Sequence, residues 1–528
     1  MAASETKSKV EVYPFYPLIH QLSDAYIVTV NGFNIPVTEH QPYDYAHFSM
    51  QGPVQITIAK TKKFGSVGEF SISPLKLGLM AKIKDNRIDF ILNEPHYLII
   101  KFDDRRELVL LADPLENDRE AVDIRDCKVH VITSKTYPAD NKGKDYATAS
   151  IQSAINDATT TGGGIVYIPP GIYKTGNLIL KSNVHLYLSG GSVLRYTGAP
   201  EIYEPLFTKF NRKFTYWIRT DLDSSNIKIT GRGIIDGDGK ATYSNPKNLG
   251  VTLLAPTRTT NFFFSGPILK EASFWNTIVM YSNTISFSNL KLLDRFDMGE
   301  NDGIDIVESS SVIVKRAIAI SWDDPFSTKT YDPGQAGGFE KIPGPALAIR
   351  DVLFEELVSW TGLFGVKIGQ GFQQPQSHVT FRDVVVYDCS CAIGIHHKYG
   401  DGLGSNILFE NVDVERISST VSERRTWLAL FVERDNQKGV VGTFGDVTVR
   451  NVVIRDMGIT GGEIRGWNSS IGVGKVTLEK IEPKALGRTA RTLEEMGITK
   501  IEYAPSIKIV AQGACLKFCK SPSRSFQK

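Results

Sequence analysis

The chain has 528 residues, of which 41% are hydrophobic and 10% aromatic, and its formal net charge is +2. This length exceeds one ordinary globular core, so we expect two domains or an elongated repeat domain. The near-neutral charge argues against nucleic-acid binding, and no stretch is long and apolar enough to span a membrane. The five cysteines lack the spacing of a disulfide framework, and the many Gly, Val, Ile and Thr residues favour a β-rich fold.

The two ends of the chain are predicted to lie outside the folded domains. Residues 1–10 are expected to be a disordered leader, and residues 511–528, which are basic and rich in serine, a disordered tail. The N-terminal region carries no apolar segment of the signal-peptide type. We therefore expect a protein that is cytoplasmic, or one that is secreted with its leader absent from this chain.

Short alternating segments dominate residues 11–136. Apolar and polar residues alternate as in β-strands, turn residues separate the segments, and helical periods are few. Strands of this length at such spacing favour an N-terminal β-sandwich domain. The segments are YIVTVNGFNIPV from Tyr26, VQITIAK from Val54, FSISPL from Phe70, RIDFILN from Arg87, HYLIIKF from His96 and ELVLLAD from Glu107.

A repeated unit organises residues 147–510, which follow a polar linker predicted over residues 137–146. After one amphipathic helix around residues 151–158, a unit of apolar, any, apolar, any, Asn or Asp, apolar recurs at irregular intervals. Strands of constant length joined by variable loops describe a right-handed parallel β-helix with Asn and Asp in its turns, so we expect an all-β fold. The copies are ISFSNL from Ile285, LAIRDV from Leu347, VTFRDV from Val379, ILFENV from Ile407 and VTVRNV from Val447, with VIVKRA from Val312 as a degenerate copy.

Three carboxylates stand out between Glu300 and Tyr331. About one turn of the expected coil separates Asp302 from the pair Asp323 and Asp324, and an alternating strand lies between them. Neighbouring strands of a parallel sheet lie about 4.8 Å apart, so the coil would bring the three side chains together. Such a cluster suits acid and base catalysis of glycosidic bond cleavage. The alternative is that these acids lie on solvated loops.

Several stretches occur in an order that is specific in combination. They are SIQSAI from Ser150, GGGIVYIPPGIY from Gly162, LKSNVHLYL from Leu180, GIIDGDG from Gly233 and SFWNTIVMYSNTISFSNL from Ser273. Together they resemble family 28 of the glycoside hydrolases, the polygalacturonases and their relatives, over approximately residues 145–455. The architecture is also similar to the family 49 dextranase and isopullulanase group, in which a β-sandwich precedes the β-helix and three aspartates act without the family 28 histidine.

The resemblance implies roles for the acids. Glu300 to Asp302 stand where family 28 has Asn-Thr-Asp, and Asp323 and Asp324 stand where it has Asp-Asp; Asp305 also fits the register. Either Asp323 or Asp324, of which we favour Asp324, would protonate the leaving-group oxygen. The remaining two aspartates would activate water for direct displacement with inversion, for which the carboxyl groups lie about 6.5–9.5 Å apart.

Two departures from the family pattern concern the substrate. Phe364 stands in place of the histidine of Gly-His-Gly, and His396 replaces the arginine of Arg-Ile-Lys, whereas Lys398 matches its lysine. Histidine is a weaker partner for a carboxylate than arginine near neutral pH. The resemblance therefore does not fix polygalacturonate as the substrate, and a neutral or differently branched polysaccharide or oligosaccharide fits as well. The residues predicted to bind it are Lys398, His396, Trp322, Tyr399, Lys367 and Asp305.

No metal or cofactor is predicted. Adjacent strand residues point to opposite faces, so His396 and His397 are poorly placed to bind one ion, and no third ligand follows at a suitable spacing. Trp322 and Tyr399 are the preferred sugar platforms among the aromatic candidates, and the loop over residues 331–345 is expected to wall one end of the cleft. The other aromatic candidates are Trp275, Phe296, Phe326, Tyr331 and Phe372.

Two competing functions remain open at this stage. A polysaccharide lyase on the same fold would remove a proton next to a carboxylate, usually with calcium or an arginine, and the absent arginine argues against it. A non-catalytic carbohydrate-binding β-helix would not need three acids in register. The sequence leaves open the sugar and its linkage, endo or exo action, and the oligomeric state.

Overall fold

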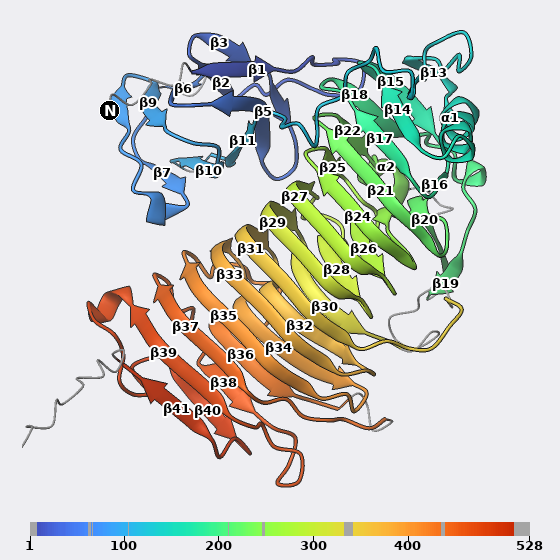
Figure 1. Ribbon diagram of the computed structural model, residues 1–528. Coiled ribbons are helices and arrows are strands. Elements are labelled where there is room, and N and C mark those ends of the chain that lie inside the picture. The colour runs from blue at the N-terminus through green and yellow to red at the C-terminus, as the bar shows by residue number, and fades with distance from the viewer. Residues whose placement is uncertain are drawn as a thin grey trace, which may run out of the picture.

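The computed structural model places two β-rich parts side by side, a small N-terminal one and a long stack of coils (Figure 1). None of the described helices is long and apolar enough to cross a membrane. The structure describes residues 8–61, 65, 67–103, 105–209, 211–244, 249–331, 342–434 and 439–511. The predicted tail with Cys515 and Cys519, and most of the predicted cleft loop over residues 331–345, lie outside these ranges.

The N-terminal part is a β-sandwich, as predicted. One sheet has the order β1-β5-β11-β10-β7, with β4 beside β5, and the other has the order β3-β2-β6-β9-β8. Alternating apolar residues of both sheets, such as Phe48, Leu110, Val28 and Ile56, form one buried core between them. The strands are β1 (Lys9–Val12), β2 (Tyr26–Val30), β3 (Phe33–Ile35), β4 (Val37–Glu39), β5 (Asp44–Gln51), β6 (Val54–Lys60), β7 (Phe70–Ser73), β8 (Lys82–Lys84), β9 (Arg87–Leu92), β10 (Tyr97–Phe102) and β11 (Leu108–Pro114).

The rest of the chain is a parallel β-helix whose rungs build an 18-stranded and a 12-stranded sheet. The 18-stranded sheet contains β12 (Val129–Val131), β13 (Lys142–Tyr146), β14 (Gly164–Ile168), β15 (Gly171–Thr175), β17 (Val184–Leu188), β18 (Ser192–Tyr196), β21 (Ser224–Gly231), β22 (Ile234–Asp236), β24 (Thr259–Ser265), β25 (Ile268–Lys270), β27 (Asn283–Leu293), β29 (Ser310–Ser321), β31 (Ile349–Thr361), β33 (Gln376–Asp388), β35 (Gly404–Val414), β37 (Val447–Ile454), β39 (Val476–Pro483) and β41 (Ile507–Val510). The 12-stranded sheet contains β16 (Leu178–Leu180), β19 (Phe207–Lys209), β20 (Arg212–Thr220), β23 (Gly250–Ala255), β26 (Thr277–Met280), β28 (Ile304–Val307), β30 (Phe326–Thr330), β32 (Phe364–Phe372), β34 (Cys391–Tyr399), β36 (Thr426–Val432), β38 (Gly462–Arg465) and β40 (Ile498–Glu502).

The first coil begins earlier in the chain than the sequence predicted. β12 and β13, in the ranges expected to be sandwich and linker, pair in parallel with β14 and β15, and β1 begins inside the expected leader. The polar segment KGKDY forms β13 although most of its residues are exposed. An end strand has little apolar surface to bury, so its sequence lacks the alternation that reveals an internal strand. The predicted amphipathic helix is α1 (Thr148–Thr160); a second helix is α2 (Gly239–Ser244).

The repeated unit corresponds to a corner of the coil. Asn289, Asp383, Asn411 and Asn451 adopt a positive φ there, which Asn and Asp tolerate better than most residues. Their side chains also form a ladder, in which Asn411 Nδ2 donates to Asp383 Oδ1 at 2.9 Å and Asn451 Nδ2 donates to Asn411 Oδ1 at 3.0 Å. The positive φ values confirm the prediction that this position lies in a turn.

One copy of the unit was assigned to the wrong register. The pairing Val312↔Val352 and Val352↔Val379 makes VLFEEL from Val352, and not LAIRDV from Leu347, the aligned copy. Both Asp351 and Glu356 have a positive φ, because each coil turns twice at this corner, five residues apart. The earlier turn produces the same local pattern as the later one, so sequence pattern alone does not separate them.

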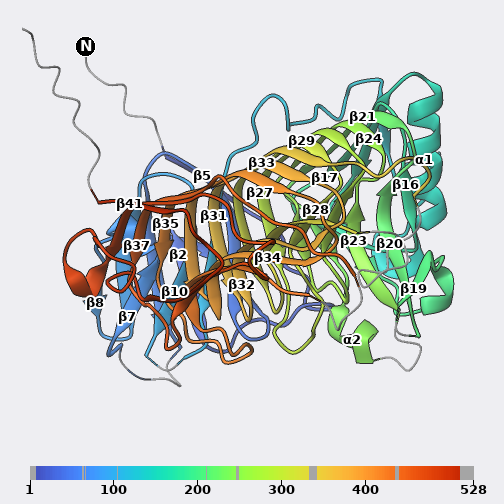
Figure 2. The same cartoon turned by 90° about the horizontal axis from the view of Figure 1, so that it is seen from below.

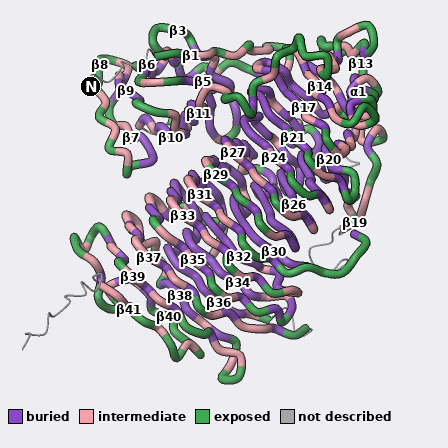
Figure 3. The backbone as a smooth tube through the Cα atoms, viewed as in Figure 1, coloured by how far each residue is buried: buried purple, intermediate pink, exposed green. Residues whose placement is uncertain are grey.

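The sandwich packs against the outer face of the 18-stranded sheet, as two views of the molecule agree (Figures 1 and 2). Buried residues run along the rungs of the coil (Figure 3), and a separate apolar cluster joins the two domains. The rings of Tyr43 and Trp360 lie 5.5 Å apart across this contact, and Lys291 Nζ lies 2.6 Å from Asp113 Oδ2 with both side chains fully buried. The outer face of the 12-stranded sheet carries the site described below.

Candidate active site

The coil brings the three predicted aspartates together. Asp302 precedes β28, while Asp323 and Asp324 precede β30, and these two strands pair in parallel with Ile304 opposite Phe326. One carboxyl oxygen of each aspartate lies within 4.8 Å of those of the other two. The acids therefore lie in the turns just before these two strands.

Backbone contacts between coils fix the positions of these acids. Asn301, which is fully buried, donates through Nδ2 to Arg295 O at 2.7 Å and accepts from Trp322 N at 3.0 Å. Asp302 O accepts from Asn276 N at 2.7 Å, and Asp324 O accepts from Gly303 N at 2.9 Å. The two acidic turns are therefore joined to each other and to the rung before them.

A small pocket opens above the acids. Two of its lysines contact the aspartates. Lys329 Nζ contacts Asp302 and lies 2.8 Å from Asp305 Oδ1 and 3.8 Å from Asp324 Oδ2, and Lys367 Nζ lies 2.7 Å from Asp324 Oδ2. The lining residues are Lys209, Trp275, Glu300, Asp302, Asp323, Asp324, Lys329, Tyr331, Lys367 and Gln370.

The carboxyl groups outnumber the ammonium groups, and this shifts their titration. Burial, together with the neighbouring carboxylates, raises the pKa of Asp302 and of Asp305. Burial and then the charge of Asp324 raise the pKa of Asp323 to about 6. Although burial alone would lower the pKa of Lys329, Asp302 and Asp305 raise it and keep this lysine charged. The cluster therefore holds a proton more readily than isolated aspartates would.

Four of the nine predicted site residues line the pocket, namely Asp302, Asp323, Asp324 and Lys367. A fifth, Asp305, lies beneath it, where its carboxylate contacts Lys329 and accepts a hydrogen bond from the Ser327 hydroxyl. It supports the pocket floor and is fully buried.

The other four predicted residues lie beside the pocket and do not line it. His396 Nε2 lies 2.9 Å from Glu433 Oε1, and burial lowers the pKa of His396 to about 4, so its ring is neutral at pH 7. Lys398 Nζ lies 3.5 Å from the same Glu433 oxygen. The Tyr399 ring lies 6.0 Å from that of Tyr331, a lining residue. The predicted substrate-binding roles of these residues remain predictions.

Trp322, the fourth of them, joins the two acidic turns through its backbone as described above. The neighbouring His397 turns inward, where its ring stacks on Phe372 at 4.1 Å and its Nε2 lies 2.9 Å from Gly402 O. His396 and His397 thus occupy opposite faces of β34 and have separate partners, as expected for adjacent strand residues.

Comparison with known proteins finds sequence similarity over parts of the chain and similarity of fold over most of it. Residues 131–199 match a family model described as rhamnogalacturonase A/epimerase, pectate lyase-like. The chain is 37% identical over 137 residues to an exo-poly-alpha-D-galacturonosidase of Dickeya chrysanthemi, covering 23% of this chain and 22% of that protein. It is 24% identical over 308 residues to a probable polygalacturonase of Vitis vinifera, covering 53% and 59%. The matches span less than two thirds of either relative.

Solved structures agree on the fold. A Yersinia enterocolitica family 28 exopolygalacturonase superposes with a TM-score of 0.50 at 14% identity, covering 87% of this chain and 93% of that one. The chain shares the fold of this enzyme, a parallel β-helix. Dex49A from Penicillium minioluteum superposes with a TM-score of 0.56 at 13% identity over 94% of this chain and 96% of the other. The likeness to family 49 architecture therefore covers the sandwich as well as the coil.

Several residues that line this pocket were not predicted from the sequence. Lys329, Lys209 and Gln370 were not named, whereas Trp275 and Tyr331 appeared only among the aromatic candidates. Lys329 could have been found by alternation, because Val307 and Lys329 are paired and share the outer face of neighbouring strands. Lys209 could not, since it reaches Glu300 from a hairpin 91 residues earlier in the chain.

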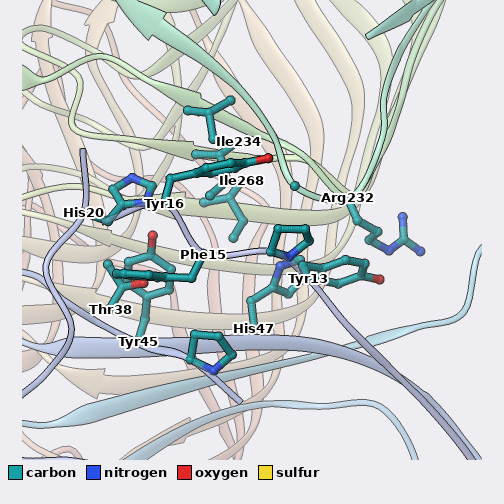
Figure 4. A pocket seen from close by; sticks show the side chains of 14 residues that line it. Tyr13, Phe15, Tyr16, His20, Thr38, Tyr45, His47, Arg232, Ile234 and Ile268 are labelled. Atoms are coloured by element: carbon teal, nitrogen blue, oxygen red, sulfur yellow. The ribbon is translucent and has the colours of Figure 1, made fainter. Parts of the chain in front are cut away.

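A second pocket lies where the N-terminal segment passes between the sandwich and the coil (Figure 4). Its two histidines and its arginine have partners within the protein. His20 Nε2 lies 3.1 Å from Asp236 Oδ2, His47 Nε2 lies 2.8 Å from Asp113 Oδ2, and Arg232 donates to Pro114 O at 2.9 Å. These contacts join the domains, so this pocket is part of their interface.

Proposed function

We propose that the chain is a glycoside hydrolase that cleaves a polysaccharide or oligosaccharide by acid and base catalysis with Asp302, Asp323 and Asp324. The observation that carries the proposal is the meeting of these three carboxyl groups in one pocket on the coil. The named relatives, two of which are a galacturonosidase and a probable polygalacturonase, support hydrolysis of a carbohydrate.

Asp323 is the best-placed proton donor, in preference to the Asp324 that the sequence favoured. It is half-buried and open to the pocket, its pKa of about 6 leaves it protonated in weakly acid solution, and it forms no ion pair within the described residues. Asp302 Oδ1 and Asp324 Oδ1 are buried and accept no hydrogen bond from the described protein groups. These two oxygens suit a water that would act as the nucleophile.

In the proposed reaction the Asp323 carboxyl proton passes to the glycosidic oxygen as its bond to the anomeric carbon breaks. The water held by Asp302 and Asp324 forms the new bond to that carbon from the opposite face and gives its proton to one of the two carboxylates. The products are an alcohol from the leaving sugar and a sugar of inverted anomeric configuration. The ammonium groups of Lys329 and Lys367 contact Asp302 and Asp324 and offset the negative charge of the receiving carboxylate.

The spacing of the acids is shorter than the sequence analysis expected. Their nearest oxygens lie within 4.8 Å, whereas inverting enzymes that use two carboxyl groups hold them about 6.5–9.5 Å apart. That separation makes room for the water between the two acids. Here the proposed water lies between Asp302 and Asp324, so Asp323 can lie closer to both.

Proton NMR of the first product is expected to show the inverted anomer. The retained anomer would contradict this and assign a carboxylate as nucleophile.

A panel of polysaccharides tests the proposal directly. Polygalacturonate, xylogalacturonan, rhamnogalacturonan, carrageenan and dextran are incubated with the protein, and the release of reducing ends is measured. Release from at least one of them is expected, with products that do not absorb in the ultraviolet. If none is cleaved, and Asp302→Asn binds the same glycans as the wild-type protein, the chain is a carbohydrate-binding protein.

A calcium-assisted lyase is the second candidate, because one oxygen from each of the three aspartates lies close enough to the others to hold a cation. The ammonium groups of Lys329 and Lys367 contact Asp302 and Asp324, which disfavours an added cation. Activity is therefore expected to be unchanged in excess EDTA. Loss of activity in EDTA that calcium restores, with an unsaturated product, would identify the lyase.

A further inference from the structure

One end of the catalytic pocket is closed by an ion pair between distant parts of the chain. Lys209, at the end of β19, contacts the carboxylate of Glu300, and both residues line the pocket. The Lys209 side chain is 10% exposed and that of Glu300 is 41% exposed, so the lysine is the buried member of the pair. The pair thus forms a wall directly beside the acids, since Glu300 is two residues before Asp302.

The hairpin of β19 and β20 that carries this wall is firmly attached to the coil. The rings of Phe207 and Phe214 stack at 5.0 Å, and that of Phe214 lies 4.4 Å from Phe274. Phe274 in turn stacks on the lining residue Trp275 at 5.4 Å. Arg212 adds a hydrogen bond from Nη2 to Ser273 O at 2.7 Å. The wall and the pocket therefore share one packed aromatic cluster.

Beyond this wall, other side chains also cover the outer face of the 12-stranded sheet at β26 and β28. Ile278 pairs with Asp305, and Met280 pairs with Val307, so these residues lie on the face that carries the site. Ile278, Met280 and Val307 are 0%, 1% and 2% exposed, because the aromatic cluster and its neighbours pack over them. A sugar chain could not lie on these rungs without displacing that cluster.

On the opposite side of the pocket, the described side chains are partly exposed. There the side chains of Lys398, Arg424 and Glu433 are 22%, 37% and 27% exposed. They extend the outer face of the 12-stranded sheet beyond Lys367, over β34 and β36. The site is thus closed at one end of the stack and open at the other, whereas attack within a long polymer needs room for sugars on both sides.

Building on the hydrolase proposed above, we propose that this protein acts at chain ends, and that Lys209 and Glu300 determine this exo specificity. The terminal sugar occupies the pocket against the wall, and the rest of the polymer leaves over Lys398 and Arg424. The polysaccharide of the panel that the wild-type protein cleaves fastest serves as the probe. Short products, with little loss of viscosity per bond cleaved, are expected from the first time points.

Variants of the wall test the assignment. Lys209→Ala and Glu300→Gln are expected to raise the loss of viscosity per bond cleaved several-fold and to lengthen the first products. The exchanged pair, Lys209→Glu with Glu300→Lys, restores opposite charges and is expected to restore short products. Lys484→Ala removes a lysine from an exposed ion pair with Glu482 elsewhere on the coil and is the matched control.

The outcomes separate this inference from the proposed hydrolase. Rapid loss of viscosity with the wild-type protein, or wall variants that remain folded and still give only short products, would overturn the assignment of Lys209 and Glu300 while leaving the hydrolase standing. Failure to cleave any polysaccharide would overturn the hydrolase itself. Thermal unfolding of each variant shows whether a changed product pattern comes from a folded protein.

Discussion

Asp323→Asn is expected to lower kcat on a natural polysaccharide by about 10²–10⁴-fold, the usual contribution of a general acid. The amide keeps the shape of the carboxyl group, but it cannot supply the proton that the leaving oxygen needs. For the wild-type protein, the same requirement means that activity falls as the pH rises above the Asp323 pKa of about 6.

A substrate with an activated leaving group distinguishes the residue that acts as general acid from those that act as bases. An aryl glycoside with a good leaving group needs little proton donation, so Asp323→Asn is expected to lose far less activity on it than on the polysaccharide. Asp302→Asn and Asp324→Asn are expected to lose most activity on both. Asp351→Asn, at an exposed left-handed corner that Asn also tolerates, controls for the change of charge. If Asp324→Asn is the variant spared instead, Asp324 is the acid.

Lys329→Met is expected to have the second large effect, on stability and on the pH profile together. Its ammonium group is buried among Asp302, Asp305 and Asp324, and removing one partner of a buried ion pair costs about 3–5 kcal/mol. Without this charge the pKa of Asp302 rises further, so Asp302 stays protonated to a higher pH. The acidic limb of the activity profile is therefore expected to move to higher pH, and kcat to fall.

The stability effect has a defined sign with pH. Carboxyl groups whose pKa is raised in the folded state favour folding below their folded pKa values and disfavour it as the pH rises through them. The free-energy deficit of Lys329→Met, measured by urea unfolding, is thus expected to be larger at pH 7 than at pH 4. Lys315→Met is the control, because Lys315 pairs with Glu355 at an exposed position, where such pairs contribute about 0–1 kcal/mol. An equal deficit at both pH values would show that Lys329 acts by packing alone.

Local pattern was enough to predict most of the fold and the centre of the site. Strand alternation is a property of neighbouring residues, so the sandwich strands and the recurring corner could be found one segment at a time. The meeting of Asp302 with Asp323 followed from the length of one coil, because successive rungs of a parallel sheet stack in register.

The remaining features depend on contacts that no local pattern records. The register of VLFEEL is fixed by pairing with β29 and β33, and the wall depends on Lys209 meeting Glu300 across several coils. His396 replaces a family arginine that was expected to face the substrate, yet its partner in the structure is Glu433, supplied by the next coil. Sequence reasoning thus found the acids and Lys367, one of the two lysines that contact them, but not Lys329.

Because the sandwich is packed on the coil, it restricts the gain or loss of whole turns of the coil. Its contacts reach from Asp236 near β22, through His20, to Glu415 of the turn after β35, which accepts a hydrogen bond from Leu75 N. Gaining or losing one winding inside this clamped interval would move every later contact by about 4.8 Å. The layers that hold the aspartates lie within the interval, so their number is fixed by the N-terminal domain, whereas layers can be added or removed freely only outside it.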